Sequence, residues 1–217
     1  IIHTALSSMN FTNLYTYDDG LGNILKNSVY YNKRKHPILK RLLYFMLGNR
    51  YSTKKIINKS SLHFTIFKKY KNVVSSNTET VDILPNNKYI FNGKKCSILL
   101  GTVFDEYYNK NDINIRVKFQ KFIDSIKGEK FYIDHPREKE QNFKNIIYEK
   151  SNRIAEEIIS DYLTKYETIN LYGFMSTTQF NFIEVENIKH HFILNNELRV
   201  NEGIKLLRNK NFFIHKL

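Results

Sequence analysis

The sequence predicts an α/β protein whose C-terminal half contains a parallel, Rossmann-like sheet. Apolar runs typical of buried strands recur along the chain from residue 96 onward. Segments with helical apolar spacing separate these runs, and strands joined by such helices pair in parallel. The 217 residues, 41% hydrophobic and 25% charged, supply enough apolar material for one large domain or two small ones.

The N-terminal part of the chain shows shorter patterns. Residues 11–17 read as a strand that enters the turn sequence Asp18-Asp19-Gly20. Within residues 54–74, the stretch LHFTIF alternates as a strand does. Residues 75–95 are polar and rich in turn residues, which is typical of a linker, so we expect a domain boundary after residue 94.

One segment of this part carries the whole net charge of +13. Between Lys26 and Lys71 there are thirteen Lys or Arg and no acid, while the remaining 21 basic residues balance 21 acidic ones. Inside the segment, HPILKRLLYFMLGNRY has the apolar spacing of one helix face. Pro37 is placed to begin this helix and Gly48 to end it.

A basic amphipathic helix has three interpretations. It is a core helix whose charges face water, or it lies on an anionic membrane surface, and we rank these two equally. Nucleic-acid binding ranks last, because the segment shows no RNP-type aromatic pattern, no zinc-finger spacing and no clear helix-turn-helix, and the rest of the chain is charge-balanced.

In the C-terminal half, strands and helices alternate in order. Four apolar runs predict strands at residues 96–104, 130–135, 168–174 and 190–194. Apolar spacings of three and four residues predict helices at residues 111–127, 153–166 and 200–209. In the second of these helices, the predicted buried face consists of Ile154, Ile158, Tyr162 and Leu163.

Composition excludes several classes of protein. With 8 Gly and 3 Pro, the chain is no collagen-like fibre. Cys96 is the single cysteine, so neither an intrachain disulfide nor a cysteine-rich zinc site can form. We find no membrane-spanning run and no signal peptide, and because the first residue is Ile we expect residues to precede Ile1.

The loops after three predicted strands carry side chains suited to chemistry. In parallel sheets, ligands bind at the carboxyl ends of the strands. There the sequence places Asp105, then His135, then the hydroxyl pair Ser176 and Thr177. Hydroxyls at a helix start can hold phosphate, so an acid, an imidazole and hydroxyls together fit transfer of a group from a phosphorylated donor. Taken singly, Asp105 and the hydroxyl pair can equally be N-caps of the helices that follow, and His135 can be a strand-end histidine bonded to a backbone carbonyl. Asp18 and Asp19 can equally form a solvated turn.

A series of motifs resembles a known family. YDDG at residues 17–20, DHPRE around His135, AEEII at residues 155–159 and YGFMSTT at residues 172–178 are similar to the bacterial lipooligosaccharide sialyltransferases, glycosyltransferase family 52. The resemblance implies a GT-B fold. Residues 95–217 then form its nucleotide-sugar-binding domain, and residues 1–94 are a remnant of the N-terminal domain, most of which precedes Ile1.

The resemblance also implies an activity: an inverting, metal-independent transfer of sialic acid from CMP-sialic acid to a sugar hydroxyl of a lipooligosaccharide or capsular glycan. It implies no cofactor and no metal site. Family members that use a glucose or galactose donor remain an alternative, as does a non-catalytic module that binds nucleic acid or membrane.

Roles follow for the residues that match the motifs. His135 is expected to donate to the departing phosphate. The base is Asp105 or Asp19, beside Asp18, and the choice is left open with a preference for Asp105. The residues expected to bind CMP are Gly101, Pro136, Arg137, Glu156, Glu157, Gly173, Ser176 and Thr177.

The expected location follows from the charge pattern. Residues 26–71 should bring a cytoplasmic enzyme to the inner face of the bacterial inner membrane, where anionic lipid attracts Lys and Arg. The expected partners are the nucleotide-sugar donor, a lipid-linked glycan acceptor and a second copy of the chain in a homodimer, with no nucleic acid.

Overall fold

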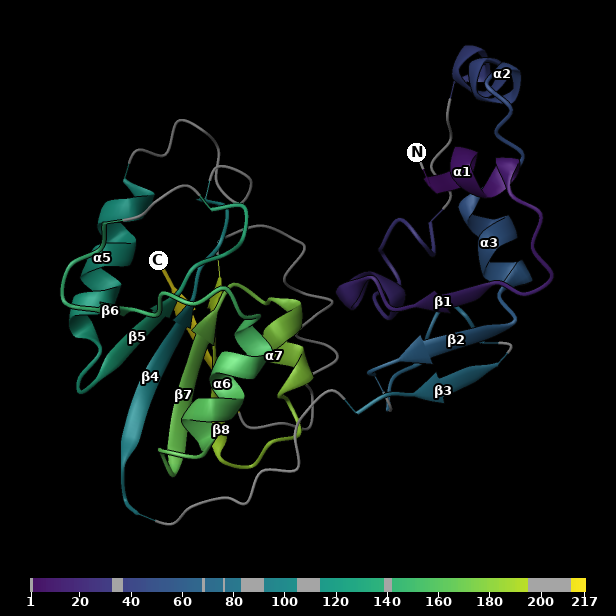
Figure 1. Cartoon of the computed structure of the whole chain (residues 1–217). Helices are drawn as coiled ribbons and strands as arrows, with labels where there is room; N and C mark the ends of the chain where they lie inside the picture. The colour runs from purple at the N-terminus through teal and green to yellow at the C-terminus, as the bar shows by residue number, and fades with distance from the viewer. Residues whose placement is uncertain are drawn as a thin grey trace. The chain divides into compact units, whose positions relative to one another are not determined.

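A computed structural model describes residues 2–32, 37–67, 69–75, 77–82, 92–104, 114–138, 142–194 and 212–217. The chain divides into two compact units, Ile1–Ile83 and Leu84–Leu217 (Figure 1). The division therefore falls earlier than the expected boundary after residue 94.

The second unit is built on a six-stranded sheet in which every neighbouring pair is parallel. Its strands are β4 (Lys95–Leu100), β5 (Lys130–Ile133), β6 (Ile147–Tyr148), β7 (Thr168–Gly173), β8 (Ile188–Leu194) and β9 (Phe212–Lys216). Their order, β6-β5-β4-β7-β8-β9, is the 3-2-1-4-5-6 order of a doubly wound sheet. The predicted α/β class with a parallel sheet is confirmed.

Helices cover both faces of this sheet, as Figure 1 shows. The helix α5 (Ile115–Ser125) packs on one face, and α6 (Ala155–Leu163) with α7 (Thr177–Asn181) packs on the other. Successive residues of β4 serve the two faces: Ile98 and Leu100 join the α6 core, and Leu99 joins the α5 core. This explains why the strand reads as a continuous apolar run.

Several predicted bounds in this unit are wrong. The strand predicted over residues 96–104 ends at Leu100, so residues 101–104 leave the sheet and enter the loop. Ile154 lies just before α6 and is 62% exposed, so it does not share the buried face of that helix. The strands β6 and β9 were not predicted, and the helix predicted at residues 200–209 lies outside the described residues.

The first unit contains a smaller parallel sheet of order β1-β2-β3. Its elements are α1 (Ile2–Ser8), β1 (Tyr15–Tyr17), the 3₁₀ helix η1 (Gly20–Asn23), α2 (Ile38–Met46), α3 (Thr53–Lys59), β2 (Leu62–Thr65) and β3 (Thr78–Thr80). The predicted strands at 11–17 and in LHFTIF are present in shorter form. The strand β3 lies in the segment that we expected to be a linker, so that prediction is wrong there.

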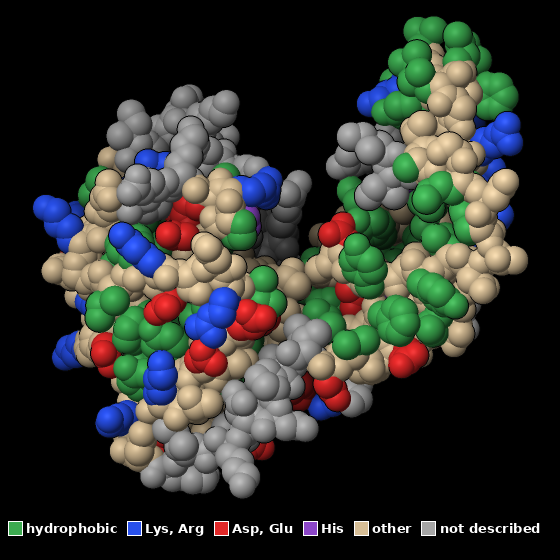
Figure 2. Space-filling view, in the orientation of Figure 1, with side chains coloured by type: hydrophobic (Ala, Val, Ile, Leu, Met, Phe, Trp, Pro, Cys, Tyr) green, Lys and Arg blue, Asp and Glu red, His purple; other side chains and the backbone are tan. Residues whose placement is uncertain are grey.

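The helix α2 begins and ends where Pro37 and Gly48 predicted, but it is not a core helix. None of its residues is buried, and Ile38, Leu39, Phe45 and Met46 are 73–82% exposed. Figure 2 shows hydrophobic side chains gathered on the surface over α2. No helix in the described ranges is long and apolar enough to cross a bilayer.

Candidate active site

Three neighbouring strands of the large sheet bring candidate residues to one edge. Because β5, β4 and β7 are parallel and adjacent, their carboxyl ends lie at the same edge. The chain winds outward from β4 through β5 in one direction and resumes with β7 on the other side, which makes β4 and β7 the switch point where doubly wound sheets bind ligands. Gly101, His135 and Ser176 follow these three strands.

The ends of β4 and β5 are in direct contact. The Gly101 N–H donates to the Ile133 carbonyl at 2.8 Å. A Cβ on Gly101 would lie 2.1 Å from Glu138 Oε2 and 2.7 Å from the His135 backbone nitrogen. Only glycine therefore allows the His-Pro loop to pack this closely on the end of β4.

The imidazole of His135 is held in one tautomer. Its Nδ1 accepts the backbone N–H of Arg137 at 3.1 Å, so in the neutral ring the proton lies on Nε2. The ring is half-buried, while Pro136 and Arg137 are exposed. Such a ring offers a hydrogen-bond donor at Nε2, and a proton when it is charged.

Glu138 supports this loop and was absent from the candidates derived from the sequence. Its carboxylate accepts the Tyr132 hydroxyl at 2.7 Å and the His135 N–H at 3.1 Å, and its own N–H donates to the His135 carbonyl at 2.8 Å. Its place in DHPRE, three residues after the histidine, is a signal that could have found it. Burial raises the pKa of Glu138 to about 7, against the two hydrogen bonds that favour the charged form.

The loop after β7 is shaped by a capping box. Ser176 Oγ accepts the Gln179 N–H at 3.2 Å, and the Gln179 side chain accepts the Ser176 N–H at 3.3 Å. Met175, just before it, has a φ of 57°, in the left-handed region that side chains other than glycine rarely adopt. Thr177 is half-buried at the start of α7. Ser176 Oγ acts here as an acceptor, so its hydroxyl hydrogen remains to be donated.

Packing against Gln179 requires a glycine at residue 173. A Cβ there would lie 2.7 Å from Gln179 Oε1, and the Gln179 side chain is fully buried. Gln179 Nε2 donates to the Leu171 and His191 carbonyls at 3.3 and 3.1 Å. A side chain at residue 173 would therefore collide with Gln179, which the glycine accommodates.

The two acids at the start of α6 differ in their surroundings. Glu156 Oε1 accepts Asn181 Nδ2 at 2.9 Å, which ties α6 to α7. Glu157 is exposed. Asn181 Oδ1 is buried and has no hydrogen-bond partner within the described ranges, so the Glu156–Asn181 pair retains capacity for one more donor.

The three candidate bases lie in different settings. Asp105 lies outside the described residues. The Asp18 side chain is 5% exposed and saturated by four hydrogen bonds. Its donors are His63 Nε2 at 3.0 Å, Asn72 Nδ2 at 2.7 Å, Thr65 Oγ1 at 2.7 Å and the Ile66 N–H at 2.9 Å. Asp18 therefore joins β1 to β2 and has no lone pair left for a substrate hydroxyl.

Asp19, the next residue, is exposed. The Tyr30 hydroxyl donates to its Oδ2, and its backbone N–H donates to Asn23 Oδ1 at 2.8 Å. Burial and Asp19 raise the pKa of Tyr30 to about 12, which keeps the phenol protonated and donating. Within the ranges that the structure describes, no cluster of three His, Cys, Asp or Glu side chains is arranged to hold a metal ion.

Comparison with known proteins shows which family this chain belongs to. The model of glycosyltransferase family 52 matches residues 1–197. An N-acetyllactosaminide alpha-2,3-sialyltransferase of Haemophilus influenzae is 29% identical over 194 residues, which cover 88% of this chain and 60% of that protein. A CMP-N-acetylneuraminate:beta-galactoside alpha-2,3-sialyltransferase of Pasteurella multocida is 32% identical over 139 residues, which cover 64% of this chain and 43% of that protein.

The chain thus spans 60% or less of the length of these two relatives. The match nevertheless extends over both units, from the YDDG turn of the first to the capping box of the second. The resemblance drawn from the motifs is confirmed, and the chain belongs to glycosyltransferase family 52.

Proposed function

We propose that this chain acts in transfer of sialic acid from CMP-sialic acid to a β-galactoside, as part of a GT-B enzyme that needs no metal. The family and the activities that name the two relatives support the donor and the acceptor class. The acceptor is a terminal sugar hydroxyl of a lipooligosaccharide or capsular glycan, and the reaction inverts the configuration at the anomeric carbon.

One observation carries the proposal: the end of β5 presents His135 at the edge where β4 and β7 also end. When the bond between sialic acid and CMP breaks, negative charge develops on the departing phosphate. The Nε2–H of His135 is suited to stabilise that charge or to protonate the phosphate oxygen. Ser176 and Thr177 supply hydroxyl donors for the same phosphate.

The remaining candidate residues have different proposed roles. Arg137 is exposed and can pair with the phosphate, with Pro136 fixing the turn before it. Glu156 or Glu157, at the start of α6, accepts ribose hydroxyls of CMP in this proposal. Gly101 and Gly173 act through packing, because each leaves room for a side chain that shapes a loop.

The attacking hydroxyl must lose a proton to a carboxylate base. Asp19 is exposed, whereas Asp18 is saturated, so within that pair Asp19 is the candidate and Asp18 positions its turn. Asp105, on the unit that carries His135, is the rival. Separate changes of Asp19 and Asp105 to Asn distinguish them, because only the base variant should lose turnover while it keeps its affinity for CMP.

The donor is tested by a transfer assay with lactose as the β-galactoside acceptor. CMP-sialic acid should support transfer, and UDP-glucose and UDP-galactose should not. Transfer from a UDP-sugar alone would assign the chain to family members with another donor. CMP binding without transfer from any donor would mark a non-catalytic nucleotide-binding chain.

The basic segment and α2 support a peripheral contact with an anionic membrane at the inner face of the inner membrane. Eight of the ten residues from Ile38 to Leu47 are apolar, and they include the most exposed apolar side chains of the first unit, Ile38 and Leu39. Lys40 and Arg41 interrupt them, and the surrounding residues 26–71 contain no acid. Apolar insertion and charge attraction act together on such a helix.

A further inference from the structure

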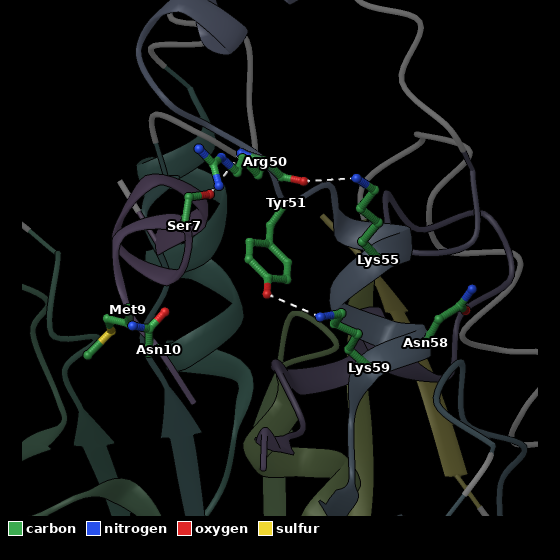
Figure 3. A pocket seen from close by; sticks show the side chains of 8 residues that line it. All are labelled: Ser7, Met9, Asn10, Arg50, Tyr51, Lys55, Asn58 and Lys59. Carbon is green, nitrogen blue, oxygen red and sulfur yellow. Dashed lines mark hydrogen bonds between the residues drawn. The ribbon is translucent and has the colours of Figure 1, made fainter. Parts of the chain in front are cut away.

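A pocket in the first unit is lined by several cations and, among the residues that the structure describes there, by no acid. It is open to solvent, has a volume of about 440 Å³ and is lined from the end of α1, the segment after α2, and α3 (Figure 3). Arg50, Lys55 and Lys59 contribute three cations, and the uncharged part of its lining includes Tyr51 and the amides of Asn10 and Asn58. This volume lies within the range of ordinary small-molecule sites, about 300–1,000 Å³.

The walls of the pocket are fixed by hydrogen bonds. The Ser7 hydroxyl accepts the Arg50 N–H at 2.8 Å and donates to the His3 carbonyl at 2.7 Å, which ties the segment after α2 to α1. Lys55 Nζ donates to the Arg50 carbonyl at 3.1 Å, and Lys59 Nζ lies 3.4 Å from the Tyr51 hydroxyl. Figure 3 shows both lysines reaching toward this segment from α3. The cations are therefore held around one space.

Folding alone does not favour this arrangement. Lys55 and Lys59 are four residues apart on one helix face, where like charges destabilise a helix. Among the described residues, none of the three cations forms an ion pair with a carboxylate. An anion in the pocket would remove the repulsion and would complete hydrogen bonds that these donors can make.

The ligand chemistry follows from the charge and the size. A phosphate monoester carries a charge of about −1.5 to −2 at neutral pH and three acceptor oxygens, so it suits three cations better than one carboxylate does. The guanidinium of Arg50 can bind two phosphate oxygens at once. The pocket is larger than a phosphate needs, and its amides and phenol suit sugar hydroxyls.

We propose that the pocket bounded by Arg50, Lys55 and Lys59 binds a phosphorylated sugar unit. The inference rests on the proposed function only for the source of that unit, which is a phosphosugar of the glycan acceptor other than the sugar that receives sialic acid. The pocket is a subsite of the first unit, separate from the donor candidates on the strands of the second.

Calorimetric titration of the full chain with glucose 6-phosphate tests the pocket. Inorganic phosphate and glucose should each bind at least about tenfold more weakly, since each offers half of the contacts. Equal affinity for inorganic phosphate would overturn the sugar part of the proposal, and equal affinity for glucose would overturn the phosphate part.

Variants then assign the site to its residues. Lys55→Gln with Lys59→Gln should weaken glucose 6-phosphate binding by about tenfold or more, and Lys55→Arg with Lys59→Arg should restore it, because charge is what the lysines supply. Lys54→Gln with Lys71→Gln removes the same charge from exposed positions outside the pocket and should change binding less than about twofold. Equal weakening by both pairs of Gln substitutions, or by neither, would overturn the proposal.

Transfer of sialic acid to lactose by the unaltered protein is measured separately, because lactose carries no phosphate. Lysine-dependent binding of glucose 6-phosphate without transfer would support the phosphosugar pocket and contradict the proposed transferase function. Transfer without such binding would support the transferase function and contradict the phosphosugar pocket.

Discussion

At the residue scale, the contacts of His135 explain how a histidine on an exposed loop keeps one orientation. The Arg137 N–H fixes Nδ1, and Glu138 fixes the backbone of the same residue. A donor that is already oriented stabilises developing charge without reorganising during the reaction. The proposed role of His135 therefore depends on Glu138, which positions the loop.

Replacing His135 tests that role. In the active enzyme, His135→Ala should lower kcat by about 10²–10⁴-fold, the range for loss of a general acid, with little change in the Kd for CMP. His135→Gln, whose amide reaches the position of Nε2, should lose less than His135→Asn. Steady-state kinetics and calorimetry check this, and near-normal turnover of the Ala variant would remove His135 from the mechanism.

Glu138 should make stability depend on pH. Its pKa rises in the folded protein from 4.5 to about 7, so the stability it contributes is present below the unfolded value and is lost as pH rises through about 7. Between about pH 5 and 8, the unfolding free energy of the unaltered protein should fall by about 1–2 kcal/mol relative to that of Glu138→Gln. This expected change is smaller than the full pKa shift implies, because solvent screens the partly exposed carboxylate.

Urea unfolding of both proteins across that range measures the difference. The Gln variant keeps the shape of the side chain and cannot ionise, so it is the matched control. Parallel pH profiles for the two proteins would show that the buried carboxylate does not titrate as its surroundings require.

At the scale of elements, the doubly wound sheet explains why the candidates converge. The strand β4 is central, and its end contacts the loop after β5 through Gly101. The carboxyl ends of parallel strands collect loops at one edge, whatever the loops contain. The sequence of each loop then decides what chemistry that edge can perform.

Gly101→Ala should disturb this contact. The added methyl group would meet the Glu138 carboxylate and the His135 backbone, so we expect a loss of about 1–3 kcal/mol in unfolding free energy, as for other overpacked sites. Gly93→Ala, where no atom lies within 4 Å but φ is +71°, controls for backbone strain and should cost about 1 kcal/mol.

Adding Glu138→Ala to Gly101→Ala separates the two clashes. The double variant should recover part of the loss, because the carboxylate is gone and the His135 backbone remains. Denaturant unfolding measures each value. A Gly101→Ala protein as stable as the unaltered chain would contradict the close packing of Gly101 against Glu138 and the His135 backbone.

The exposed helix α2 makes its own prediction. The protein should sediment with vesicles that contain anionic lipid and less with neutral vesicles at moderate salt. Lys40→Gln with Arg41→Gln should weaken that binding by about tenfold or more, since each cation near the surface adds about 1 kcal/mol. Leu39→Asn with Phe45→Asn should weaken it through lost insertion.

Val117→Asn is the matched control, because Val117 is also exposed, at 53%, but lies on α5 in the other unit. It should leave vesicle binding unchanged. Equal binding to neutral and anionic vesicles would rule out the electrostatic part of the proposal.

At the scale of the whole molecule, the sequence predicted the large sheet better than the small one. Strands β4, β5, β7 and β8 are mostly buried, so apolar residues are frequent along them. The three-residue strands β1 and β3 are mostly exposed and offer little pattern. The strand β6 has two residues, too few for any periodicity.

The site shows the same division. The positions of His135 after β5 and of Ser176 after β7 could be predicted, because motif and strand end coincide, and their roles stay predictions. The saturation of Asp18 could not, since His63, Thr65 and Asn72 lie far along the chain and meet it only through pairing of β1 with β2. The helix α2 was predicted correctly as a helix, but amphipathic spacing does not tell which surface covers the apolar face.

Hydrogen exchange of the chain with and without CMP, with UDP as the comparison, tests most directly where the nucleotide binds. We predict that CMP slows exchange in the loops that follow β4, β5 and β7, around Gly101, His135 and Ser176, and that UDP does so less. Unchanged exchange in those loops with saturating CMP, or protection confined to the first unit, would contradict the claim that the edge of the large sheet holds the nucleotide.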